Sequence, residues 1–163
     1  MEEKYLIFNV RDKRFAVQSK IISEVAVFEK VFPLPLVPGY VRGIINRYSV
    51  PYALIDISFL LLKETSNARK VIVLKEEMDK LAFLIDDVTD IADLPPDKLM
   101  KIEQEETAAA GGEPGNADAR FFASASGTGL VSSFFEWKDS SVFCLDTGEI
   151  INRIKRDFNH SDV

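Results

Sequence analysis

Residues 70–92, KVIVLKEEMDKLAFLIDDVTDIA, repeat the pattern of residues 4–26, KYLIFNVRDKRFAVQSKIISEVA, at a constant offset of 66 positions. In each copy an alternating apolar run is followed by a polar turn and a second apolar run, which is the pattern of a β-hairpin. Residues 23–26 and 89–92 then align so that each position keeps its hydroxyl, carboxylate, β-branched or methyl character. We interpret the two segments as structural copies of one another.

The later part of each copy also ends in the same way. Residues 52–56 and 142–146 are apolar runs that finish in aspartate, with two leucines or isoleucines at the same distance beyond. Asp146, supported by Glu149, is expected to cap a C-terminal helix, and Asp56 to cap a shorter one. One face of the C-terminal helix is expected to carry Ile150, Ile154 and Phe158.

The offset between these later parts is 90 instead of 66, so the second copy holds 24 additional residues. They fall within 103–129, which is rich in alanine and glycine and poor in large apolar side chains, and we predict a flexible surface loop there. Each copy contains about five short strands, and closure is how short antiparallel sheets remove their exposed edges. The predicted fold is therefore mainly β, with two small β-barrel lobes, short helices and a C-terminal helix.

The composition is that of an ordinary globular protein, with 47% hydrophobic and 28% charged residues. The net charge is −6 and the basic residues are scattered, so nucleic acid is not an expected partner. No apolar run approaches the roughly 20 residues that cross a bilayer. Residues 1–4 are charged and lack the apolar core of a secretory signal. We expect a cytoplasmic protein without direct membrane insertion.

Residue types that carry catalysis or bind metals are scarce. The only histidine, His160, lies in a polar tail, and the single cysteine, Cys144, lies in an apolar run. One residue of each type cannot supply the three or four ligands of a zinc site. Carboxylates cluster between positions 86 and 93 without the spacing of an EF-hand loop. We predict that the protein is not an enzyme and has no cofactor and no metal.

The segment 43–57, GIINRYSVPYALIDI, is similar to the central signature of the bacterial chemotaxis coupling protein (CheW) family, G-V-I-N-L-R-G-x-V-I-P-V-I-D-L. Without any insertion, the positions that match are Gly43, Ile44, Ile45, Asn46, Leu54, Ile55, Asp56 and Ile57. Residues 70–98 and 130–151 resemble later parts of the family, so the likeness covers nearly the whole chain. It implies a single domain over residues 1–163, built from two five-stranded SH3-like barrels that share a core. We place these lobes at about 1–65 and 66–158.

The resemblance implies a function by contact, with no bond made or broken. Members of the family are adaptors that join the cytoplasmic tip of a chemoreceptor to the regulatory domain of a CheA-type histidine kinase. Four positions carry over as candidate partner-binding residues. Ile22 and Glu24 are expected on the exposed side of the first lobe, and Gly43 and Asn46 in the strand that leads into the signature.

The chain departs from the family at the Arg-Gly pair of the signature, where it has Tyr48 and Ser49. The family proline is also displaced, because Ala53 occupies its place and Pro51 lies two residues earlier. Tyrosine cannot reproduce the fixed fork of donors that arginine offers. Arg47 could compensate only if the strand twists or bulges, because adjacent side chains of a strand face opposite sides. We include Arg47 and Tyr48 among the candidate partner-binding residues.

Two other functions remain open. The changes at Tyr48 and Ser49, together with the additional loop, suggest a divergent accessory or regulatory module that binds one of the two usual partners or a different one. A small-ligand-binding β-barrel is supported only by the aromatic content of 10%, and such rings are more typical of a core.

Overall fold

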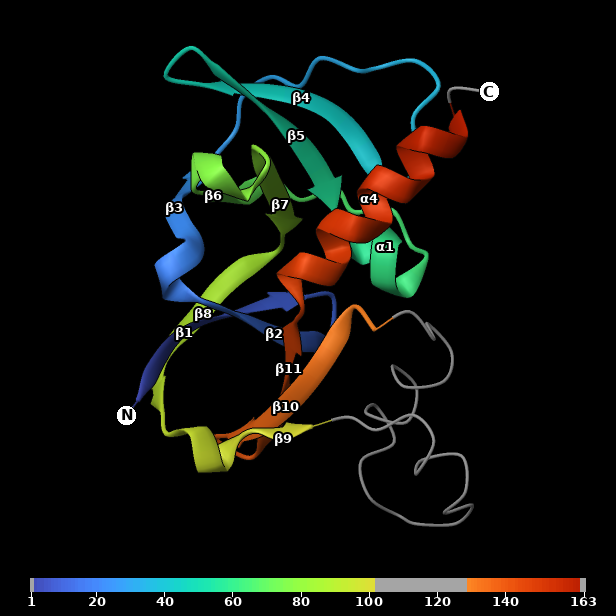
Figure 1. Cartoon of the computed structure of the whole chain (residues 1–163). Coiled ribbons are helices and arrows are strands. Elements are labelled where there is room, and N and C mark those ends of the chain that lie inside the picture. The colour runs from blue at the N-terminus through green and yellow to red at the C-terminus, as the bar shows by residue number, and fades with distance from the viewer. Residues whose placement is uncertain (1, 102–128, 162–163) are drawn as a thin grey trace.

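The computed structural model covers the whole chain and describes residues 2–101 and 129–161 (Figure 1). The flexible loop predicted at 103–129 lies outside the described residues except for its last position. The elements in chain order are β1 (Glu3–Val10), β2 (Lys13–Gln18), η1 (Ser19–Ile21), β3 (Ile22–Val27), β4 (Val41–Arg47), β5 (Val50–Asp56), α1 (Ile57–Leu62), β6 (Lys70–Leu74), η2 (Glu76–Met78), β7 (Leu81–Ile85), β8 (Asp87–Leu94), η3 (Pro96–Lys98), β9 (Met100–Lys101), β10 (Val131–Trp137), β11 (Ser140–Leu145) and α4 (Thr147–Ser161).

The strands form two sheets, one above the other in Figure 1. The six-stranded sheet has the order β8-β1-β2-β11-β10-β9, and the five-stranded sheet has the order β3-β6-β7-β5-β4. We refer to them as the six-stranded lobe and the five-stranded lobe. The prediction of a mainly β protein with two lobes, short helices and a C-terminal helix is confirmed. One lobe has six strands instead of five because the two-residue β9 pairs with the edge of β10.

The two copies of the repeat exchange their hairpins. The β1–β2 hairpin of the first copy pairs with β8 and β11 of the second, while β6–β7 pairs with β3 and β5 of the first. The lobes therefore do not correspond to residues 1–65 and 66–158, as the sequence-based division assumed. In this arrangement both faces of each hairpin are buried, one against a barrel interior and the other against the core shared by the lobes.

Strand β7 shows this double burial directly. Leu81, Phe83 and Ile85 belong to the large core that both lobes share, whereas Ala82 and Leu84 fill the interior of the five-stranded lobe. Because successive side chains of a strand point to opposite faces, a continuous apolar run is what such a position requires. A third apolar cluster fills the interior of the six-stranded lobe. The barrel interiors are thus packed with side chains, which leaves the predicted ligand-binding barrel without support from the described residues.

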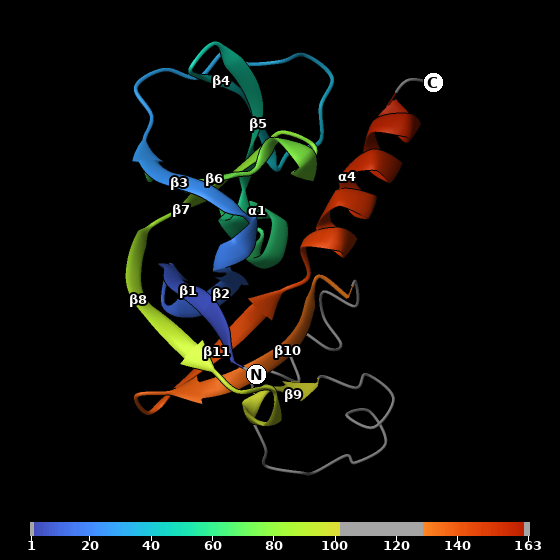
Figure 2. The same ribbon diagram turned by 60° about the vertical axis from the view of Figure 1, so that its left-hand side comes forward.

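Each lobe is closed by the chain that follows its outer strand. Beyond β3, Phe32 exchanges two backbone hydrogen bonds of 2.8 Å with Ile44 on β4. Beyond β8, the chain passes through η3 into β9, which pairs with β10 (Figure 2). Closure of this kind covers edges that would otherwise offer free backbone groups.

Helix α4 leaves the six-stranded lobe and lies along the five-stranded lobe (Figures 1 and 2). Asp146 caps it as predicted, since the Glu149 N–H donates to Asp146 Oδ1 at 3.1 Å. The predicted apolar face is also present, with Ile150 and Ile154 buried and Phe158 half-buried. No helix within the described residues is long and apolar enough to cross a membrane.

Candidate protein-binding face

Glu24 on β3 and Arg47 at the end of β4 form a two-pronged ion pair. Arg47 Nε donates to Glu24 Oε2 at 3.0 Å, and Arg47 Nη2 donates to Oε1 at 2.9 Å. Both side chains are about a quarter exposed, at 25% and 24%. The parallel hydrogen bonds match the planar fork of arginine to the carboxylate and fix both groups in one geometry. Two of the six candidate residues are therefore brought into direct contact.

The turn between β4 and β5 places Tyr48 beside this pair. Tyr48 and Ser49 have φ values of 52° and 68°, the left-handed backbone of a type I′ hairpin turn. The Tyr48 side chain is 85% exposed, and its ring centroid lies 5.4 Å from the Arg47 guanidinium carbon. Arg47, and not the residue at the family's arginine position, thus bonds to the carboxylate of β3. Strand β4 carries a bulge upstream of it, between Val41 and Gly43.

Strand β3 exposes the opposite side from the one that we predicted. Ile22 is half-buried and packs against the shared core, so the expectation that Ile22 and Glu24 lie on the exposed side is wrong. Once Ile22 faces inward, the period-two alternation of a strand turns Val25 and Val27 toward solvent. Val27 is 57% exposed. Val25 and Val27 were not among the predicted site residues, because the sequence does not reveal which face of this strand points inward.

Gly43 and Asn46 occupy different environments on β4. Gly43 is buried with a φ of +137°, and a Cβ at this position would lie 2.3 Å from the Phe32 carbonyl oxygen. Its glycine is needed for the close approach that seals the sheet, so it is not part of the exposed face. Asn46 is exposed and pairs with Pro51 across the hairpin. A role for Asn46 in binding stays a prediction.

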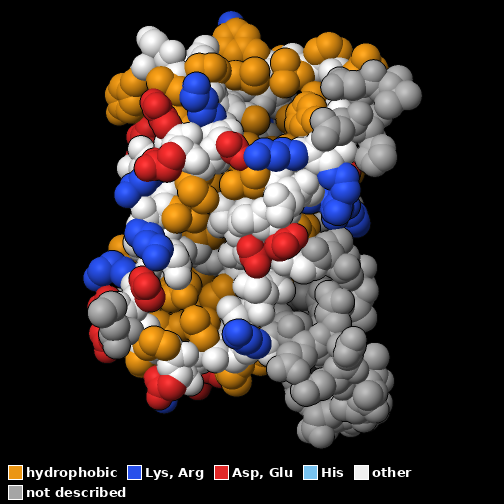
Figure 3. Space-filling model, in the orientation of Figure 1, with side chains coloured by type: hydrophobic (Ala, Val, Ile, Leu, Met, Phe, Trp, Pro, Cys, Tyr) orange, Lys and Arg blue, Asp and Glu red, His pale blue; other side chains and the backbone are white. Residues whose placement is uncertain are grey.

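Exposed apolar side chains gather on the five-stranded lobe. Six of the eight large hydrophobic residues that are exposed in the described part of the chain lie there, and together we call them the exposed apolar face: Val25, Val27, Phe32, Leu34, Leu36 and Tyr48. Figure 3 shows hydrophobic surface along the end of the molecule where this lobe lies. Apolar surface that is gathered in this way marks protein interaction sites, whereas single exposed hydrophobic residues need no explanation.

The six-stranded lobe carries a related but different arrangement at the equivalent positions. Asp90, the counterpart of Glu24, forms an ion pair with Lys138 Nζ at 2.8 Å and accepts a hydrogen bond from Trp137 Nε1 at 2.9 Å. Lys138 first, and Trp137 second, lower the pKa of Asp90 to about 2. Ile91, the counterpart of Val25, is exposed as well. The two lobes thus present a carboxylate and a β-branched side chain at matching places.

Comparison with models of protein families shows which family the chain belongs to. The model of the CheW-like domain matches residues 4–115. The chain belongs to the CheW-like domain family. Its structure resembles the crystal structure of the scaffolding protein TtCheW from Thermoanaerobacter tengcongensis, with a TM-score of 0.67 and 14% sequence identity over 90% of each chain. At that identity the likeness concerns the fold alone, and no curated protein matches the sequence.

The single cysteine of this CheW-like domain lies in a packed apolar environment. Cys144 is buried, and burial raises the pKa of its thiol to about 11, so the thiol is protonated at neutral pH. Within residues 2–101 and 129–158, no three His, Cys, Asp or Glu side chains are grouped so that they could hold a metal ion. The side chain of His160 lies outside the described part of the chain.

Proposed function

We propose that this chain is a non-catalytic adaptor that couples chemoreceptors to a CheA-type histidine kinase in chemotaxis signalling. The observation that carries the proposal is the exposed apolar face beside the Glu24–Arg47 ion pair, on a domain of the CheW-like family. The partners would be the regulatory domain of the kinase and the cytoplasmic tip of a receptor. This role would require the chain to act in the cytoplasm.

The physical properties of the face suit a reversible contact between proteins. Val25 and Val27 lie on a paired strand, so their positions are fixed before binding and little conformational entropy is lost. The ion pair beside them is half-buried and can fix the orientation of a partner. Small interfaces of transient assemblies bury about 1,200 Å² or less, and we expect micromolar affinity.

Reversing one charge of the ion pair tests its part in kinase binding. Glu24→Lys places two cations side by side, and we expect the affinity for a CheA regulatory domain to fall about tenfold or more. The double variant Glu24→Arg with Arg47→Glu restores an ion pair in the opposite sense, and we expect it to recover part of the loss if the pair acts by orienting the strands. Isothermal titration calorimetry measures both affinities, and circular dichroism confirms that each variant is folded. Unchanged affinity in Glu24→Lys would show that the ion pair is not part of the kinase interface.

A single carboxylate on the exposed apolar face tests the face itself. Val25→Asp puts a charge where apolar surface would be buried, and we expect kinase binding to weaken by about tenfold or more. Ile91→Asp is the matched control, because it makes the same change at the equivalent position of the six-stranded lobe. Equal losses in both variants would show that binding does not depend on the five-stranded lobe in particular.

Separate binding assays distinguish the adaptor from a module with one partner. Tyr48 and Ser49 replace the family's Arg-Gly pair, and this change is the reason to test receptor and kinase individually. An adaptor retains both a receptor cytoplasmic fragment and a kinase regulatory domain at tens of micromolar. Retention of only one would favour the accessory module. If neither partner binds and Glu24→Lys changes no interaction, the adaptor assignment fails.

A further inference from the structure

Asp56 in the five-stranded lobe has a full set of partners at the junction of β5 and α1. Its Oδ1 accepts a hydrogen bond from the Phe59 N–H at 3.1 Å, which caps α1. Its Oδ2 accepts from the Ser66 N–H at 3.0 Å and from Arg42 Nη1 at 3.0 Å. Arg42 Nη1 also lies 2.9 Å from the Ser66 carbonyl oxygen. The carboxylate is completely buried, and a guanidinium group neutralises it.

Asp146 occupies the same place in the six-stranded lobe. Its Oδ1 caps α4 through the Glu149 N–H at 3.1 Å, as Asp56 caps α1. Its own N–H donates to the Leu130 carbonyl at 2.8 Å, and the N–H of Asp56 donates to the equivalent Tyr40 carbonyl at 2.7 Å. The backbone and one carboxylate oxygen are therefore held identically in the two lobes.

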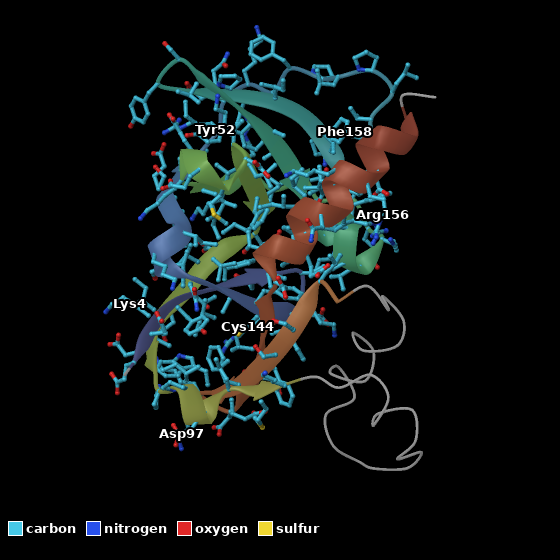
Figure 4. All side chains as sticks on the ribbon, viewed as in Figure 1. Lys4, Tyr52, Asp97, Cys144, Arg156 and Phe158 are labelled. Atoms are coloured by element: carbon cyan, nitrogen blue, oxygen red, sulfur yellow. The ribbon has the colours of Figure 1, made fainter. Side chains whose placement is uncertain are left out.

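Within its described residues, the six-stranded lobe has no arginine to bond to Asp146 Oδ2, as Arg42 bonds to Asp56 Oδ2. The position equivalent to Arg42 is Ser132, whose side chain is too short to reach and carries no charge. Among the residues that the structure describes, none donates a hydrogen bond to Asp146 Oδ2. Asp146 lines a pocket of about 280 Å³, whose polar lining also includes Tyr5, Gln18 and Ser133. Cys144, which also lines this pocket, lies on β11 beneath α4 (Figure 4).

We propose that this pocket receives an arginine side chain of a partner protein, whose guanidinium group bonds to Asp146 Oδ2. The chain itself shows that a guanidinium group fits this carboxylate, because Arg42 fills the equivalent place on Asp56. The inference rests on the proposed function in one respect, namely that a partner protein supplies the arginine. The pocket lies on the six-stranded lobe, apart from the exposed apolar face of the five-stranded lobe.

The chemistry of the pocket favours a guanidinium group over other ligands. An anion would meet the negative charge of Asp146, and an apolar group would leave Asp146 Oδ2 without a hydrogen-bond donor. A lysine ammonium group could neutralise the charge, but it is a compact, strongly hydrated ion with no planar fork. Arginine offers several donors in one plane, so it can bond to the carboxylate and to the Gln18 or Tyr5 oxygen together.

Titration with N-acetyl-L-arginine amide tests the pocket without any kinase or receptor. In two-dimensional amide NMR spectra of the full chain, we expect saturable shifts at Gln18, Ser133 and Thr147, with a dissociation constant in the millimolar range. Asp146→Asn keeps the helix cap, because asparagine caps as well as aspartate, but removes the charge and should weaken binding about tenfold or more. The lysine analogue should bind at least several-fold more weakly than the arginine amide. No saturable shift in the natural chain, or equal binding by Asp146→Asn, would overturn the proposal.

Supplying the missing arginine from within the chain gives a second measurement. Ser132→Arg introduces a guanidinium group at the position equivalent to Arg42, so we expect it to raise the melting temperature by about 2–4 °C and to abolish binding of the arginine amide. Ser132→Lys is the matched control. We expect it to raise the melting temperature less than Ser132→Arg and to leave part of the arginine amide binding. A melting temperature that does not rise, in a folded Ser132→Arg variant that still binds the amide, would contradict the proposal. Failure of these tests leaves kinase binding at the Glu24–Arg47 pair unaffected, so the two proposals can fail separately.

Discussion

Replacing Asp56 with alanine is expected to lower the free energy of unfolding by about 3–5 kcal/mol, the range for a buried ion pair that loses one partner. The carboxylate is fully buried, and three groups donate hydrogen bonds to it. Its removal leaves the Ser66 and Phe59 N–H groups without acceptors and Arg42 without its counter-charge. Since domains are stable by only about 5–15 kcal/mol, the loss would be a large fraction of the total.

Asp146→Ala is the matched control for Asp56→Ala. Both changes remove the aspartate that caps a helix after an equivalent strand, but the Asp146 side chain makes only the capping bond within the described residues. We therefore expect a loss of about 1 kcal/mol, the usual value for an N-cap. Urea unfolding followed by circular dichroism measures both values. Similar losses in the two variants would show that the Arg42–Asp56 pair contributes little beyond the cap.

The hairpins and helix caps could be predicted from the sequence because each depends on a local pattern. Alternation predicted the β1–β2 and β6–β7 hairpins, and the constant offsets predicted the repeat. The exchange of hairpins between the copies could not be predicted in this way. Pairing of β1 with β8 joins residues 78 to 91 positions apart, and the repeat allows the same contacts within a copy or between copies.

Only part of the candidate site was predicted. The residues that were missed depend on which face of strand β3 points inward. A family position pointed to Glu24, and the departure from the family's Arg-Gly pair pointed to Arg47; the structure joins the two residues in one ion pair. The residues that accompany them were not found, because the inward position of Ile22 depends on the shared core and turns Val25 outward. A one-residue change of phase exchanges every exposed side chain of a strand for a buried one. Sequence alone does not reveal which face of β3 meets that core.

Gly43→Ala is expected to destabilise the chain by about 3 kcal/mol or more, through backbone strain and a steric clash together. The φ of +137° is unfavourable for any residue with a Cβ, and that atom would lie 2.3 Å from the Phe32 carbonyl oxygen. The clash is with backbone, so no side-chain rotation relieves it. The same carbonyl accepts the Ile44 N–H at 2.8 Å, so the seam that closes the five-stranded lobe must open.

Gly129→Ala separates the clash of Gly43→Ala from its backbone strain. Gly129 also has a positive φ, of +74°, but an added Cβ there would meet no atom within 4 Å. We expect it to cost about 1–2 kcal/mol, the usual penalty for a left-handed backbone. Hydrogen exchange should show loss of protection at the Ile44 amide in Gly43→Ala alone. Equal destabilisation by the two changes would mean that the Phe32 segment does not lie against β4. If instead the seam opens as expected, weaker kinase binding by a Gly43 variant would follow from displacement of Phe32, because Gly43 itself is buried and offers a partner no surface.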